Sequence, residues 1–117
     1  MKFLVIDQDR GAMQKLGLAC LERGAGIVIA ETVSEGVRAL LGEVVSLIVV
    51  DAALLRLTAW EHVTLFERVA PAVPVVVVVR PDTPLETRVG FELAGLRVLT
   101  RPVTPEDLIE KLEAQTI

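Results

Sequence analysis

Residues 47–51 read Leu-Ile-Val-Val-Asp, and residues 75–79 are five consecutive valines. Neither run alternates apolar with polar residues, so both faces of each segment are expected to be covered, as in a parallel sheet between two layers of helices. Because the runs are short and β-branched, they predict strands. We therefore expect residues 47–50 and 75–79 to be central strands of an α/β sheet.

The rest of the chain repeats an alternation of strand and helix. Short apolar segments predict three further strands, at residues 3–6, 27–30 and 97–100, and the segments between strands have apolar residues at helical spacing. The first helix is predicted to begin after Asp9 and to run toward Gly24. Five βα units with right-handed crossovers predict a single three-layer, doubly wound domain over residues 1–117.

Helix starts are marked by a repeated pattern. In three places a threonine stands three residues before a glutamate, a spacing that can satisfy two free N–H groups of a first helical turn. These threonines are Thr32, Thr58 and Thr83. A fourth start is predicted at Thr104, which is followed by proline and two acids.

Composition excludes several classes of function. Apolar residues make up 52% of the 117 residues, which indicates a packed globule, and the net charge of -4 leaves no basic surface for direct nucleic-acid binding. One cysteine and one histidine cannot supply a tetrahedral zinc site. With a lone Cys20, no secretory signal and no spanning apolar run, we expect a cytoplasmic protein without a membrane segment.

Charged residues follow four of the predicted strands. Asp7 and Asp9 follow the first strand, Asp51 the third, Arg80 the fourth and Arg101 the fifth. In an open parallel sheet, ligands and chemistry gather at the carboxyl ends of the strands. We therefore expect the acids and the arginines to share one pocket at this edge, with Arg80, Arg101 or both pairing with Asp51 or Asp7 as counter-ions.

The order of these motifs resembles that of a response-regulator receiver domain over the whole chain. The motifs are Phe-Leu-Val-Ile-Asp-Gln-Asp at residues 3–9, the run ending in Asp51, Pro74 before the valines, Ala94-Gly95 and Arg101-Pro102. The resemblance implies a flavodoxin-like fold with sheet order 2-1-3-4-5. It also implies that Asp51 is the phosphoacceptor of a two-component phosphorelay, with a histidine kinase or phosphotransfer protein as donor.

The acidic pocket departs from the family pattern. Asp7 matches the first acid of the family pair, whereas Gln8 replaces the second. The family holds Mg²⁺ with these acids and the phosphoacceptor, so we expect Asp7 and Asp51 to bind Mg²⁺ weakly or not at all. Asp9 can compensate only by turning inward from the helix start.

The switch positions also depart from the pattern. The family hydroxyl on the fourth strand is Val79, the family aromatic on the fifth strand is Val98, and Arg101 stands in place of the family lysine. Arg80 occupies a position that is small in the family. An arginine keeps the lysine charge but not its compact point-charge geometry. These residues predict an atypical receiver, or pseudo-receiver.

Two exposed aromatics are predicted. In the fourth helix, Leu85, Val89, Leu93 and Leu96 are expected to face the sheet, which places Phe91 on another face. The resemblance implies that the fourth helix, fifth strand and fifth helix meet an effector or partner protein, or a second copy in a homodimer. Phe91 is therefore the candidate partner contact. Trp60 also lies off its helix stripe, while His62 and Cys20 are expected to be packing residues.

Three functions follow from these observations. The preferred one is a non-enzymatic protein-interaction module whose degenerate site is fixed by its arginines. The alternative is a functional receiver with Mg²⁺-dependent phosphorylation of Asp51. A third is a small nucleotide or flavin binder, which is disfavoured because residues 8–11 place acids where a phosphate needs bare backbone N–H groups.

Overall fold

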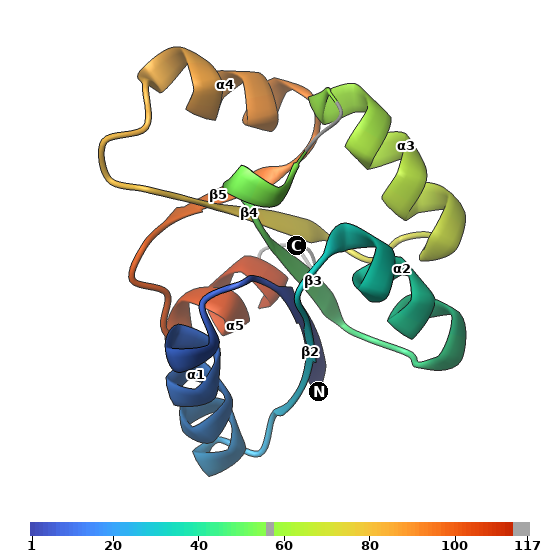
Figure 1. The fold of residues 1–117 in the computed structure, drawn as a ribbon, viewed down its shortest axis with the longest axis vertical. Helices are drawn as coiled ribbons and strands as arrows, with labels where there is room; N and C mark the ends of the chain where they lie inside the picture. The colour runs from blue at the N-terminus through green and yellow to red at the C-terminus, as the bar shows by residue number, and fades with distance from the viewer. Residues whose placement is uncertain (56–57, 114–117) are drawn as a thin grey trace.

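Five parallel strands lie side by side in the order β2-β1-β3-β4-β5, in a computed structural model that describes residues 1–55 and 58–113 (Figure 1). The strands are β1 Lys2–Ile6, β2 Gly26–Ala30, β3 Leu47–Asp51, β4 Val75–Val79 and β5 Arg97–Thr100. The helices are α1 Arg10–Glu22, α2 Val33–Gly42, α3 Ala59–Val69, α4 Leu85–Leu93 and α5 Pro105–Glu113, with a short 3-10 turn at Ala52–Leu54. The predicted fold class and strand order are confirmed.

Helices cover both faces of the sheet, which explains the unbroken apolar runs of the inner strands (Figure 1). Helices α1 and α5 cover one face, where Phe3, Met13 and Leu108 are buried. Helices α2, α3 and α4 cover the other, where Leu40 and Phe66 pack on the sheet. No helix in the described ranges is long and apolar enough to cross a bilayer.

The predicted helix caps form at three of four places. Thr58 and Glu61 make a full capping box, and the side chains of Thr104 and Asp107 accept hydrogen bonds from each other's backbone N–H groups. Thr32 accepts from the backbone N–H of Glu35.

The prediction for Thr83 is wrong. Helix α4 has Pro84 at its N-cap and no side-chain cap. Because the helix therefore begins one residue later, Thr83 lies outside the position from which a hydroxyl caps a helix.

Helix α4 also presents the opposite face from the one predicted. Leu85, Val89 and Leu93 have exposed fractions of 73%, 40% and 75%, although Leu96, which follows the helix, is buried. Phe91 is half-buried and packs against the core on the α2, α3 and α4 side. Leucine spacing alone could not decide the inner face, because Phe91 is the larger apolar side chain and takes the inner position.

The sequence also predicts whether His62, Cys20 and Trp60 are buried or exposed. His62 is only 2% exposed and stacks on Phe66 within α3, so it is more deeply buried than predicted. Burial lowers the pKa of His62 and, with Glu61 opposing that shift, favours the neutral ring. Cys20 is fully buried in the core, and burial raises the pKa of its thiol. Trp60 is 65% exposed, as predicted.

Candidate functional site

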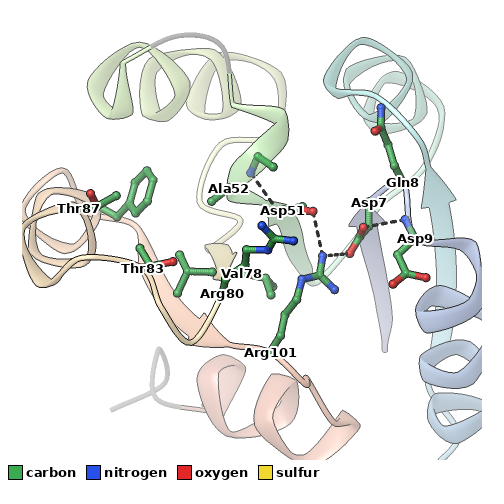
Figure 2. A pocket seen from close by; sticks show the side chains of 13 residues that line it. Asp7, Gln8, Asp9, Asp51, Ala52, Val78, Arg80, Thr83, Thr87 and Arg101 are labelled. Carbon is green, nitrogen blue, oxygen red and sulfur yellow. Dashed lines mark hydrogen bonds and ion pairs between the residues drawn. The ribbon is translucent and has the colours of Figure 1, made fainter.

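Three charged side chains meet at the carboxyl edge of the sheet. Asp7 follows β1 and Asp51 ends the adjacent strand β3, while Arg101 follows β5, which lies one strand beyond β4 (Figure 2). A single nitrogen, Arg101 Nη2, donates to Asp7 Oδ2 at 2.5 Å and to Asp51 Oδ2 at 2.9 Å. An arginine therefore pairs with the acids, as the sequence predicts, and Arg101 makes the contact with both of them.

The remaining oxygen of each carboxylate is held by the backbone. The N–H of Asp9 donates to Asp7 Oδ1 at 3.0 Å, and the N–H of Ala53 donates to Asp51 Oδ1 at 3.0 Å. All four carboxylate oxygens thus accept a hydrogen bond. Because the acids are largely buried, this satisfaction offsets the cost of removing their charges from water.

Arg101 remains charged in this setting. Burial lowers the pKa of its guanidinium, but the hydrogen bonds and charges of Asp7 and Asp51 act the other way and outweigh burial, so that the pKa is raised. The side chain of Arg101 is 27% exposed, against 10% for Asp7 and 20% for Asp51. A half-buried cation that contacts two carboxylates is an internal counter-ion.

Gln8 and Asp9 do not join this cluster. Gln8 is exposed, and Figure 2 shows its amide directed away from Asp51 and Arg101. Asp9 caps α1, because its Oδ1 accepts from the N–H of Ala12 at 3.0 Å. The inward turn that would let Asp9 replace the missing acid is therefore not adopted.

Arg80 takes no part in the bridge. It lines the same pocket but is exposed, and among the described residues its guanidinium makes no hydrogen bond or ion pair. Of the two arginines predicted as counter-ions, Arg101 therefore pairs with the acids and Arg80 does not. Arg101 lies close enough to neutralise both acids, whereas Arg80 remains in contact with water.

A cavity of about 630 Å³ extends from the acids toward α4 (Figure 2). Its far wall includes Thr83, Thr87 and the ring of Phe91. None of these three was predicted as a pocket residue. They line the pocket because of the way α4 is oriented, and the apolar spacing of α4 predicted the wrong orientation.

The two switch positions are apolar. Val79 is 2% exposed within the core, and Val98 packs against the same core cluster. Neither side chain can donate or accept a hydrogen bond. A polar contact instead lies beside them, where Arg88 Nη1 donates to the hydroxyl of Thr100 at 2.7 Å. No local sequence motif identifies Arg88 as a functional residue, because its hydrogen-bond acceptors lie before α4 and in β5.

The donor set does not fit Mg²⁺ in this arrangement. Mg²⁺ requires oxygen ligands in near-octahedral geometry. The facing oxygens of Asp7 and Asp51 both bond to Arg101 Nη2, so a guanidinium fills the space between them. Gln8, which could supply a further oxygen, is directed elsewhere.

The chain is similar in sequence to known regulators. No family model matches it. Over 114 residues it is 28% identical to transcriptional regulatory protein GlrR of Escherichia coli (strain K12), covering 94% of this chain and 25% of that protein. The same values hold for transcriptional regulatory protein QseF of Escherichia coli O157:H7. The chain thus spans about a quarter of the length of these curated relatives.

Solved structures share the fold over nearly the whole chain. A two-component response regulator from Clostridium difficile matches with a TM-score of 0.81 at 23% identity, covering 99% of this chain and 95% of that one. A CheY-like response regulator receiver domain protein from Methanospirillum hungatei JF-1 matches with a TM-score of 0.78 at 25% identity, covering 98% and 95%.

One structural neighbour records an occupied site. A response regulator from Burkholderia pseudomallei, with a TM-score of 0.79 at 21% identity over 98% of this chain and 71% of that one, contains a phosphorylated aspartic acid, a calcium ion and citrate. The fold of the present chain is that of response-regulator receiver domains, in agreement with the resemblance inferred from its sequence.

Proposed function

We propose that this receiver-fold chain is a protein-interaction module of a two-component pathway, in which Arg101 replaces metal and phosphoryl group as the partner of Asp51. It acts by binding and not by catalysis. Its similarity to two transcriptional regulatory proteins and its shared fold with a two-component response regulator support a place in such a pathway. A cytoplasmic location is part of the proposal, on the sequence ground of a single cysteine, Cys20.

One observation carries the proposal. Arg101 Nη2 contacts both carboxylates, at 2.5 Å and 2.9 Å, and a backbone N–H occupies the second oxygen of each. An incoming phosphodonor would have to displace a charge-assisted bridge before Asp51 could attack it. With Val79 in place of a hydroxyl, a phosphoryl group at Asp51 would also lack a side-chain donor on β4.

A phosphorylatable Asp51 is the second candidate. Asp51 ends β3 beside an open cavity, and a structural neighbour carries a phosphorylated aspartic acid. A nucleotide site has less support. The N–H of Asp9 already donates to Asp7, and the carboxylate of Asp9 occupies the first turn of α1, where a phosphate would bind.

The exposed side of α4 is the proposed partner surface. It is defined here as the α4 stripe, Leu85, Val89 and Leu93, which are separated by four residues and lie on one face of the helix. Three neighbouring exposed apolar side chains favour contact with a partner protein or a second copy of this chain. This surface replaces Phe91 as the candidate contact, since Phe91 packs inward.

Acetyl phosphate labelling tests the proposal. The purified chain is incubated with acetyl phosphate and Mg²⁺, and its intact mass is measured against an Asp51→Asn control. We expect no phosphoryl adduct on the wild type, because the Arg101 bridge occupies Asp51. In Arg101→Lys, which restores the compact cation of the family, we expect labelling to rise.

A phosphorylatable receiver domain treated in parallel verifies that the donor is active. Wild-type labelling that Asp51→Asn abolishes would overturn the proposal and establish the second candidate. Labelling that persists in Asp51→Asn would indicate modification at another residue and would not count for either function.

A further inference from the structure

Helix α4 is weakly anchored by apolar packing. None of its residues is fully buried, and it has no side-chain cap at its N-terminus. Phe91 packs only partly against the core. Most helices of a folded domain depend on a buried apolar face for their stability. The position of α4 must therefore be held by other contacts.

Arg88 supplies those contacts from the inner side of α4. Its Nε donates to the carbonyl of Thr83 at 3.3 Å, and its Nη2 donates to the carbonyls of Arg80 and Pro81 at 3.2 and 3.4 Å. Its Nη1 donates to the hydroxyl of Thr100 at 2.7 Å. One half-buried guanidinium thus joins three carbonyls of the β4–α4 connection to the end of β5.

We propose that Arg88 is a clamp that holds the β4–α4 connection and α4 against the end of β5, so that the α4 stripe is presented in one orientation. A guanidinium suits this role because its planar array of donors can serve several acceptors at once. Lysine, with one nitrogen, cannot reach the same four acceptors. The clamp follows from these contacts, whereas its effect on partner binding rests on the proposed function.

The clamp lies beside Val79 and Val98, whose side chains cannot form a polar contact between α4 and β5. These valines contribute only apolar packing to the core. The Arg88 contact with Thr100 is therefore a polar link between α4 and β5 at this end of the sheet. Thr100 immediately precedes Arg101, so adjacent residues hold α4 and neutralise the acids.

Amide hydrogen exchange measured by NMR tests the clamp on the intact chain. The informative amides are those of Thr83 and Thr87, which donate to the carbonyls of Arg80 and Pro84. In Arg88→Met, which keeps side-chain length but removes every donor, we expect both amides to exchange about tenfold faster. In Thr100→Val, which removes one acceptor, we expect an acceleration of about threefold.

Arg38→Ala is the matched control, since Arg38 is an exposed helical arginine with no hydrogen bond or ion pair among the described residues. In the Arg38→Ala variant, the amides of Thr83 and Thr87 should exchange at the wild-type rate. Unchanged exchange in Arg88→Met, or equal acceleration throughout the sheet, would overturn a local clamp. If Arg88→Met fails to fold, unchanged exchange in Thr100→Val overturns it. Neither result depends on the labelling of Asp51, so the two proposals can fail separately.

Discussion

The Nη2 atom of Arg101 connects two carboxylates that come from different strands, and the consequences are energetic as well as chemical. Without this cation, Asp7 and Asp51 would be two close, largely buried negative charges. Removing one member of a buried pair usually costs more than the pair contributes, because the other member is left uncompensated. Arg101 is thus expected to contribute to stability as well as to closing the site.

Arg101→Ala should lower the free energy of unfolding by about 1–3 kcal/mol, a range reduced from that of fully buried pairs because the side chains are partly exposed. Urea denaturation provides the measurement. Arg10→Ala is the control, since Arg10 pairs with Glu31 at an exposed site and should cost much less. A variant as stable as the wild type would contradict the counter-ion role.

The residues of the site were predictable to different degrees. Asp7, Asp51 and Arg101 could be placed together because each follows a strand of a parallel sheet, and such strands end at one edge. The absence of an Arg80 ion pair could not be predicted, because exposure decides whether a long side chain pairs. The role of Arg88 was not predicted, because three of its acceptors are backbone carbonyls, which every residue has and which no sequence pattern marks.

Helix α2 shows how closely a helix approaches the sheet. A Cβ added to Gly36 would lie 2.4 Å from Ile6 Cδ1 and 2.8 Å from Ile6 Cγ1. Ile6 is fully buried in β1, so it has little freedom to move aside. The absence of a side chain at Gly36 is therefore what lets α2 pack on β1.

Gly36→Ala should reduce the free energy of unfolding by about 1–2 kcal/mol, because overpacking outweighs the better helix propensity of alanine. The same substitution at Gly42, in the same helix, meets no atom within 4 Å and should be neutral or slightly stabilising. Thermal or urea unfolding of both variants measures this difference in stability. Equal stabilities would show that Ile6 rearranges without cost.

Strands and helices differed in how well their patterns predicted them. The two valine-rich strands are buried on both faces, so their apolar runs had a single interpretation. In α4 the leucines form a regular stripe, yet the helix turns Phe91 and Arg88 inward. Periodicity detects an amphipathic helix but cannot say which apolar face the core accepts.

The acidic site and the α4 stripe lie at different places in the molecule and are held by different arginines. Arg101 fixes the acids, and Arg88 holds the connection that leads to α4. A ligand shifts a conformational equilibrium only if it contacts the two states differently. With valines at both switch positions, neither of these two side chains can transmit a change of charge at Asp51 to α4 through a hydrogen bond.

We therefore expect association through the α4 stripe to be independent of the charge at Asp51. Sedimentation of the chain over a range of concentrations should show self-association that Leu85→Ser combined with Leu93→Ser weakens at least tenfold, because these side chains are largely exposed. Asp51→Asn should leave the association constant within about twofold of the wild type. Leu41→Ser, on α2, is the control, since Leu41 is 76% exposed and lies outside the stripe. A loss with Asp51→Asn as large as that with the stripe variant would restore a phosphorylation-dependent switch.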